Sequence, residues 1–190
     1  RQISLLSEED TLRLIKEPVS DTVEYQSDVP QRIYRLTGGQ PFYTQHICQL
    51  LIERLNSLQR NKVYADDVEK TAFELVDNPP PQMMYFWNEE LDSGEKLVLI
   101  LLGRILERID TYATAGMIAD YASNREKELK LDTNEIIRIL DELCQYELIE
   151  RERIKEDEYE YRYKIDIFRH WVQRHQSIAQ IKREINSSRE

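Results

Sequence analysis

Apolar residues recur every three or four positions through the first part of the chain, which is the period of helices that pack on one side against a core. This spacing predicts four helices: one between Ser7 and Pro18, one between Asp28 and Gly38, one that starts at Pro41, and one from Asp66 to about Val76. The third helix has its apolar residues on a single stripe: Tyr43, Ile47, Leu50, Leu51 and Leu55. We expect the four helices to form one bundle.

Residues at the predicted helix ends support these boundaries. Ser7 is followed by three acidic residues, as expected of an N-cap and a first helical turn. Asp28 is the predicted N-cap of the second helix, with Pro30 in its first turn. Gly38 and Gly39 then predict the end of that helix, because glycine readily adopts the left-handed conformation that closes a helix.

A run of prolines, Pro79 to Pro81, interrupts the helical pattern and predicts a semi-rigid spacer, because it removes three amide donors. We therefore expect a helical domain over residues 1–77, a linker with a short helix over 78–92, and a second domain over 93–190. Ser93 is the predicted N-cap of the next helix. The six consecutive apolar residues of that helix, 97–102, indicate that it is covered on most sides.

The second domain continues with a short extended piece, two helices and a change of period from 3.6 to 2. The predicted boundaries are 111–114 for the extended piece, 115 to about 121 and 132 to about 146 for the helices, and 148–154 and 159–165 for two alternating strands. The strands predict a β-hairpin with a charged tip at 155–158. We expect Tyr159, Tyr161 and Tyr163 to pack on the core from one strand face, and one amphipathic helix to follow.

This order of elements is typical of a winged-helix domain. The expected fold class is therefore mainly α: a four-helix bundle, followed by a winged helix with one β-hairpin and a C-terminal helix.

Composition limits the possible functions. The 190 residues carry 26 Lys and Arg against 36 Asp and Glu, a net charge of -10, which opposes the phosphate contacts of nucleic-acid binding. No apolar run approaches the roughly 20 residues of a membrane helix, so we expect no membrane contact. Cys48 and Cys144 lie far apart in helical patterns and are expected to be buried, reduced thiols of a cytoplasmic protein. The chain opens at Arg1 without a signal peptide, and we expect it to be a piece of a longer polypeptide.

The sequence lacks the motifs of an enzyme active site. No Gly-x-x-x-x-Gly-Lys-Ser/Thr loop occurs, so we expect no ATP hydrolysis by this chain alone. His46, His170 and His175 have neither the spacing of a zinc site nor the partners of a catalytic triad. We expect no catalytic residue and no metal site.

The segment Thr37 to Phe42 joins the second and third helices and is the one candidate site. It has two interpretations. In the structural one, glycine closes one helix and proline opens the next. In the functional one, the amides at the start of the third helix face a nucleotide, and Pro41 and Phe42 contact its base or ribose.

Three segments together resemble the small helical lid of AAA+-like signalling ATPases of the STAND and archaeal-ATPase kind. They are Leu5 to Glu9, Leu36 to Gln45 with Cys48, and Val63 to Val68. In that family the lid ends its second helix in a Gly-x-Pro motif and precedes a winged helix, so the resemblance covers nearly the whole chain. It implies that Gly39, Gln40, Pro41 and Phe42 lie at the nucleotide, with Pro41 near the adenine.

The resemblance also implies the context of the chain. An upstream P-loop domain of the same polypeptide would hold ATP or ADP with Mg²⁺, and the complete protein would be an ATPase in signal transduction. The lid and winged helix would regulate it by switching conformation, with protein partners or self-association. This fragment would bind no cofactor by itself.

The sequence departs from the family pattern at three points. The middle residue of the Gly-x-Pro motif, often histidine, is Gln40, and no arginine opens the third helix. Lys164-Ile165-Asp166 stands where some STAND proteins have Met-His-Asp, and it lacks the histidine. We therefore expect no charge-based nucleotide sensor here.

Two alternatives to a nucleotide switch remain. A winged helix commonly places its third helix in the major groove, which makes a DNA-binding module of an origin-binding-type ATPase the main rival. The charges disfavour it: Asp132, Glu135, Asp141 and Glu142 stand against Arg138 in that helix, and acidic residues interleave the basic ones of the hairpin. The second alternative is a protein-interaction adaptor without a nucleotide.

Overall fold

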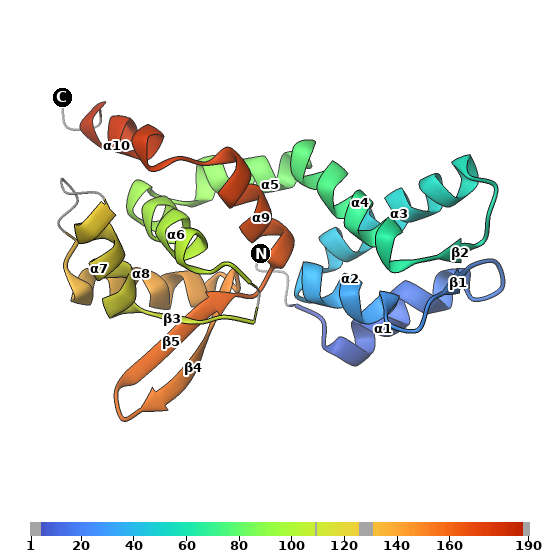
Figure 1. Ribbon diagram of the computed structural model, residues 1–190, viewed down its shortest axis with the longest axis horizontal. Coiled ribbons are helices and arrows are strands. Elements are labelled where there is room, and N and C mark those ends of the chain that lie inside the picture. Colours follow the sequence, from blue (N-terminus) through green and yellow to red (C-terminus); the bar gives the residue numbers. More distant parts are fainter. Residues whose placement is uncertain (1–4, 109, 126–130, 188–190) are drawn as a thin grey trace. The chain divides into compact units, whose positions relative to one another are not determined.

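The computed structural model describes residues 5–108, 110–125 and 131–187, which are mainly helical with one two-stranded and one three-stranded sheet (Figure 1). Contacts divide the chain into two compact units. The first comprises Arg1–Pro79 and Ile165–Ile167, and the second comprises Pro80–Lys164 and Phe168–Glu190. None of the helices described is both long enough and apolar enough to cross a bilayer.

The first unit contains the four predicted helices. In chain order its elements are α1 Glu8–Lys16, the 3₁₀ turn η1 Glu17–Val19, β1 Glu24–Tyr25, α2 Val29–Thr37, α3 Pro41–Ser57, β2 Lys62–Val63 and α4 Ala65–Asp77. The strands β1 and β2 pair in parallel, with Tyr25 opposite Val63. This small sheet was not predicted, because two-residue strands are too short to show an alternating pattern.

The core of the first unit is formed by one apolar stripe from each helix. Ile15 of α1, Ile33 of α2 and Leu75 of α4 are almost completely buried. The stripe predicted for α3 is confirmed at four positions, Tyr43, Ile47, Leu51 and Leu55, whereas Leu50 is half-buried. Burial of these side chains is the main contribution to the stability of such a small bundle.

Both predicted N-cap residues of this unit stand at the N-cap position, but only Ser7 makes the capping hydrogen bond with its side chain. The Ser7 hydroxyl accepts a hydrogen bond from the amide of Asp10 at 3.1 Å, as an N-cap does. Asp28 stands at the N-cap position of α2, but its side chain makes no capping hydrogen bond. Its carboxylate instead accepts a hydrogen bond from Nε of Arg32 at 2.7 Å, so an ion pair with the next turn takes the place of the cap.

The second unit contains the helices and the hairpin predicted for residues 93–165. Its elements are α5 Pro81–Tyr85, the π turn η2 Phe86–Glu90, α6 Ser93–Ile105, β3 Ala113–Thr114, α7 Ala115–Arg125, α8 Thr133–Gln145, β4 Ile149–Lys155, β5 Glu158–Tyr163, α9 Asp166–His175 and α10 Ile178–Ser187. Of α9, the part from Phe168 onward belongs to this unit. The sheet order is β3-β5-β4, with antiparallel pairing throughout. β4 and β5 form a hairpin that extends beyond the helices of this unit (Figure 1).

Three local expectations for this part of the chain are wrong. The N-cap of α6 is Asp92 and not Ser93: the Asp92 carboxylate accepts the amide of Glu95, and the Glu95 carboxylate accepts that of Asp92, both at 2.8 Å. The single final helix is two helices, because the Ser177 hydroxyl accepts the amide of Gln180 and starts α10 afresh. The proline spacer is also shorter, since Pro81 is the first residue of α5.

Helix α6 is the centre of the second unit. Seven consecutive residues, Leu97 to Gly103, are buried, which confirms the prediction of a helix covered on most sides. Tyr161 and Tyr163 of β5 are also buried, as predicted, whereas Tyr159, at the start of the strand near the hairpin tip, is only half-buried. The Tyr163 hydroxyl donates to the carbonyl of Leu99 at 2.6 Å. Burial of that phenol raises its pKa, so Tyr163 stays a neutral donor.

The C-terminal end of α6 is held by two side chains of α9. Nη1 of Arg169 donates to the carbonyl of Leu106 at 3.1 Å and to that of Glu107 at 3.3 Å. Nε2 of Gln173 donates to the carbonyl of Gly103 at 2.6 Å. Because the last carbonyls of a helix have no partner within it, these bonds complete α6 and join it to α9.

Replacing Arg169 with Ala should destabilise the second unit by about 2 to 3 kcal/mol, since buried carbonyls lose a charged donor. Urea unfolding followed by tryptophan fluorescence measures this directly, because Trp87 and Trp171 both lie in the second unit. Arg104→Ala, at an exposed position on α6, is the control and should cost less than about 0.5 kcal/mol. Equal effects of the two substitutions would contradict the role assigned to Arg169.

Candidate functional site

The corner between α2 and α3 has the backbone conformation that its two glycines predict. Gly38 has φ 57° and ψ 24°, and its amide donates to the carbonyl of Tyr34 at 2.8 Å, which closes α2. Gly39 follows with φ 75°. Both values lie in the left-handed region, where glycine is the residue with the least strain.

Gly39 is further constrained by the close approach of a neighbouring segment. The amide of Leu6 donates to the carbonyl of Gly39 at 2.9 Å, which ties the residues before α1 to the corner. A Cβ atom on Gly39 would lie 2.3 Å from the carbonyl oxygen of Leu6. Gly39 therefore has a structural role at this position, whether or not a ligand binds nearby.

Gln40 caps α3 with its own side chain. Its Oε1 accepts a hydrogen bond from the amide of Tyr43 at 2.8 Å. Pro41, the first residue of α3, has no amide hydrogen, so Phe42 supplies the remaining donor of the first three residues. The interpretation of this helix start as a set of unpaired amides is therefore wrong, because the chain itself takes up most of the donors that would bind a phosphate.

Two buried hydroxyl groups fix the angle between α2 and α3. Oγ1 of Thr44 donates to Oγ1 of Thr37 at 3.0 Å, and Oγ1 of Thr37 donates to the carbonyl of Ile33 at 3.0 Å. Both threonines are fully buried, so these bonds face no competition from water. The corner is consequently rigid and presents its outer side chains in one arrangement.

Those outer side chains are Pro41 and Phe42, and both are half-buried. The ring of Phe42 stacks on the imidazole of His46, with 5.8 Å between the centroids and 16° between the planes. The adjacent Tyr43 turns inward and is buried. Pro41 and Phe42 thus form a small apolar surface next to the corner, suited to contact with a flat ring.

The histidines and cysteines considered in the sequence form no metal site among the residues that the structure describes. No group of three metal-binding side chains occurs among the described residues. Cys48 and Cys144 are free thiols, but they are half-buried rather than buried as expected. Burial nevertheless raises the pKa of Cys48 to about 12 and that of Cys144 to about 11, which keeps both thiols protonated at neutral pH.

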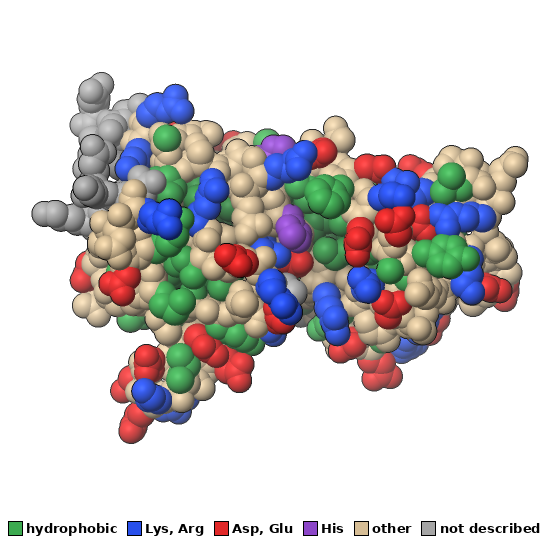
Figure 2. All heavy atoms as spheres, viewed as in Figure 1, with side chains coloured by type: hydrophobic (Ala, Val, Ile, Leu, Met, Phe, Trp, Pro, Cys, Tyr) green, Lys and Arg blue, Asp and Glu red, His purple; other side chains and the backbone are tan. Residues whose placement is uncertain are grey.

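Most basic residues of α8 and the hairpin are engaged in ion pairs with acidic neighbours, whereas Arg153 donates to the carbonyl of Lys155. Arg138 bonds to Glu142 at 2.7 Å within α8. Nε of Arg162 donates to Glu150 across the hairpin at 2.6 Å, and Arg151 of β4 bonds to Asp141 of α8. In the view of Figure 2, acidic and basic side chains alternate on the hairpin without a continuous basic surface. These pairs leave few cations available for phosphate groups.

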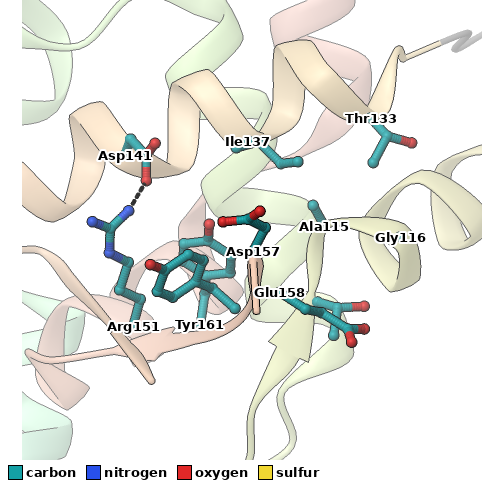
Figure 3. Close-up of a pocket in the computed structure, with 11 residues that line it drawn as sticks. Ala115, Gly116, Thr133, Ile137, Asp141, Arg151, Asp157, Glu158 and Tyr161 are labelled. Atoms are coloured by element: carbon teal, nitrogen blue, oxygen red, sulfur yellow. Dashed lines mark hydrogen bonds and ion pairs between the residues drawn. The ribbon is translucent and has the colours of Figure 1, made fainter. Parts of the chain in front are cut away.

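One cavity that the sequence did not predict lies in the second unit between α8 and the β4–β5 hairpin (Figure 3). Its volume is about 320 Å³. Residues from five elements and from the hairpin turn line it, including Ala115, Ile137, Asp141, Arg151, Asp157 and Tyr159. The cavity forms because the hairpin packs beside α8. This is a tertiary contact, so no local pattern in the sequence could predict the cavity.

Comparison with known proteins gives no further evidence on the site, because no protein-family model and no curated protein matches the chain significantly.

Replacing Gly39 with Ala should destabilise the first unit by about 1 to 3 kcal/mol, because the new methyl group meets the Leu6 carbonyl and φ stays positive. Thermal unfolding followed by circular dichroism would measure the loss. Gly116→Ala is the control: Gly116 is exposed on α7, and a Cβ atom there would lie 3.7 Å from its nearest neighbour, Oγ1 of Thr114. That control should be neutral or slightly stabilising, and an equally harmless Gly39→Ala would contradict the close approach of Leu6.

Proposed function

We propose that the chain is the regulatory part of a STAND-like AAA+ ATPase, with residues 1–77 as the lid and residues 93–190 as a winged helix. The observation that carries the proposal is the rigid corner at Gly38 to Phe42, which presents Pro41 and Phe42 as an apolar surface. It supports the assignment of Gly39, Gln40, Pro41 and Phe42 to a nucleotide site.

The corner fits the base or ribose of a nucleotide better than its phosphates. Gln40 takes up the amide of Tyr43, and Pro41 has none, so few donors remain for an anion. Pro41 and Phe42 can still cover one face of an adenine ring. In this proposal the phosphates and Mg²⁺ of ATP or ADP belong to a P-loop domain upstream in the complete protein.

The order of elements in the second unit supports the winged-helix part. A helix, a short strand, two helices and a hairpin follow one another, and the short strand β3 pairs with β5 of the hairpin. In the complete protein, the lid would close over the nucleotide, and the winged helix would pack in one nucleotide state and be released in the other. The chain itself then regulates and does not catalyse.

The first test is the reading frame upstream of Arg1. The proposal expects a Gly-x-x-x-x-Gly-Lys-Ser/Thr loop and an acidic metal-binding strand within about one domain, roughly 150 to 200 residues. Absence of both from an upstream coding sequence would reject the nucleotide switch and leave a two-domain binding module.

The second test uses the complete protein and a fluorescent ATP analogue. Phe42→Ala should weaken binding roughly tenfold, because an aromatic contact with the base is lost. Pro41→Ala should also change nucleotide affinity or exchange without unfolding the lid. Phe73→Ala is the matched control, since Phe73 is 64% exposed on α4 of the same unit. Unchanged affinity in both corner variants would exclude the motif from the nucleotide site.

The alternative function is DNA binding by the second unit, which its order of elements favours. The paired charges of α8 and the hairpin argue against it. We expect a labelled duplex to bind weakly at about 50 mM salt and to show little change at about 200 mM. Tight binding that falls steeply over this range would support the DNA-binding module instead.

A further inference from the structure

The cavity of the second unit has an apolar wall and an acidic rim. Ala115 at the start of α7 and Ile137 of α8 contribute aliphatic side chains, and Tyr159 of β5 contributes a ring. Ile137 is 39% exposed, although it lies on a helix whose other isoleucines are buried. The volume of about 320 Å³ is at the lower end of ligand pockets, roughly 300 to 1,000 Å³.

The one arginine that lines the cavity is already neutralised. Arg151 bonds to Asp141 of α8, and its guanidinium carbon lies 4.6 Å from the centroid of the Tyr159 ring. The pair closes one end of the cavity, as Figure 3 shows. Arg151 therefore holds the hairpin against α8 and offers no free charge to an incoming anion.

The carboxylates on the other side are not neutralised in the same way. Asp157 occupies the two-residue turn between β4 and β5, and its carboxylate is directed toward α8 (Figure 3). Within the described residues no hydrogen bond or ion pair engages this carboxylate. Glu158 has only an exposed, 3.7 Å contact with Lys155. An entering cation would meet one free carboxylate and one weakly paired carboxylate.

We propose that this cavity, called the groove below, binds a segment of a partner protein in which a lysine or arginine lies next to an aliphatic side chain. The basic head would pair with Asp157 and Glu158, while the apolar stem and the aliphatic neighbour would cover Ile137 and Ala115. Charge complementarity selects this occupant over DNA, whose phosphates the same carboxylates repel. The groove is independent of the proposed nucleotide corner, because it is built from residues of the second unit alone.

The test uses the full chain and three fluorescent peptides of equal length in anisotropy titrations: one alternating Arg and Leu, one alternating Arg and Ser, and one alternating Glu and Leu. The Arg/Leu peptide should bind most tightly. The Arg/Ser peptide should bind more weakly because it leaves the apolar wall uncovered, and the Glu/Leu peptide should not bind.

Variants then locate the binding site. The double substitution Asp157→Asn with Glu158→Gln should weaken the Arg/Leu peptide about fivefold to tenfold, and Ile137→Ala should weaken it about threefold. The matched control is Glu152→Gln with Glu156→Gln, which removes the same charge from exposed hairpin positions that do not line the cavity. It should change affinity less than twofold.

Each of the remaining outcomes overturns the proposal. An equal loss of peptide affinity in the groove variants and in the control variant would mean nonspecific attraction to an acidic chain. Equal affinity for the Arg/Leu and Arg/Ser peptides would mean that the apolar wall does not contribute to binding. If spermidine, at a concentration that supplies the same positive charge as the peptide, displaces the Arg/Leu peptide, the groove would be a polyamine site. Self-association abolished by the groove variants would indicate a second copy as the occupant.

Discussion

The backbone contact between Leu6 and Gly39 is the constraint on which the candidate nucleotide corner depends. The amide of Leu6 reaches the carbonyl of Gly39 only because residue 39 has no side chain on that face. The left-handed conformation of Gly38 ends α2 on one side of this contact, and the Gln40 cap and Pro41 start α3 on the other. The hydroxyls of Thr37 and Thr44 then hold the two helices together from inside. The position of Phe42 follows from this arrangement, and its ring is also stacked on the imidazole of His46.

The second unit depends in a similar way on completing the end of α6. This helix is too apolar to remain exposed and too buried for water to satisfy its last carbonyls. Arg169 and Gln173 supply the missing donors from α9, and Tyr163 adds a hydrogen bond from the sheet to the carbonyl of Leu99 in the middle of the helix. A charged side chain in the core is tolerated here because its hydrogen bonds are directed at backbone carbonyls. The helices and the hairpin are thereby held on one central element.

The sequence predicts long periodic elements well and short contacts poorly. Helices α3 and α6 are evident because burial imposes a pattern over many residues, and the glycine corner is evident because few residues tolerate a positive φ. The two-residue strands β1 and β2 show no such pattern. The sequence also does not show which of two neighbouring polar residues caps a helix. Asp92 caps α6 although Ser93 is equally suitable by type, and Ser177 divides the last helix.

The candidate sites follow the same rule. The residues of the corner are contiguous, so their proximity could be predicted, but the use of Gln40 as a cap could not, because its side chain could equally have faced solvent. The cavity beside α8 combines residues from 114 to 161, and only packing brings them together.

The use of Gln40 also bears on how a lid of this kind could respond to a nucleotide. A histidine at this position, as the resembled family often has, could carry a charge near neutral pH and bind a phosphate. Gln40 carries no charge, and its oxygen is occupied by the amide of Tyr43. In the proposed switch, the response of this corner to a nucleotide would come from whether Pro41 and Phe42 are covered, which is a difference in apolar burial. Such a contact distinguishes a bound nucleotide from an empty site more readily than ATP from ADP, because the two share the same base.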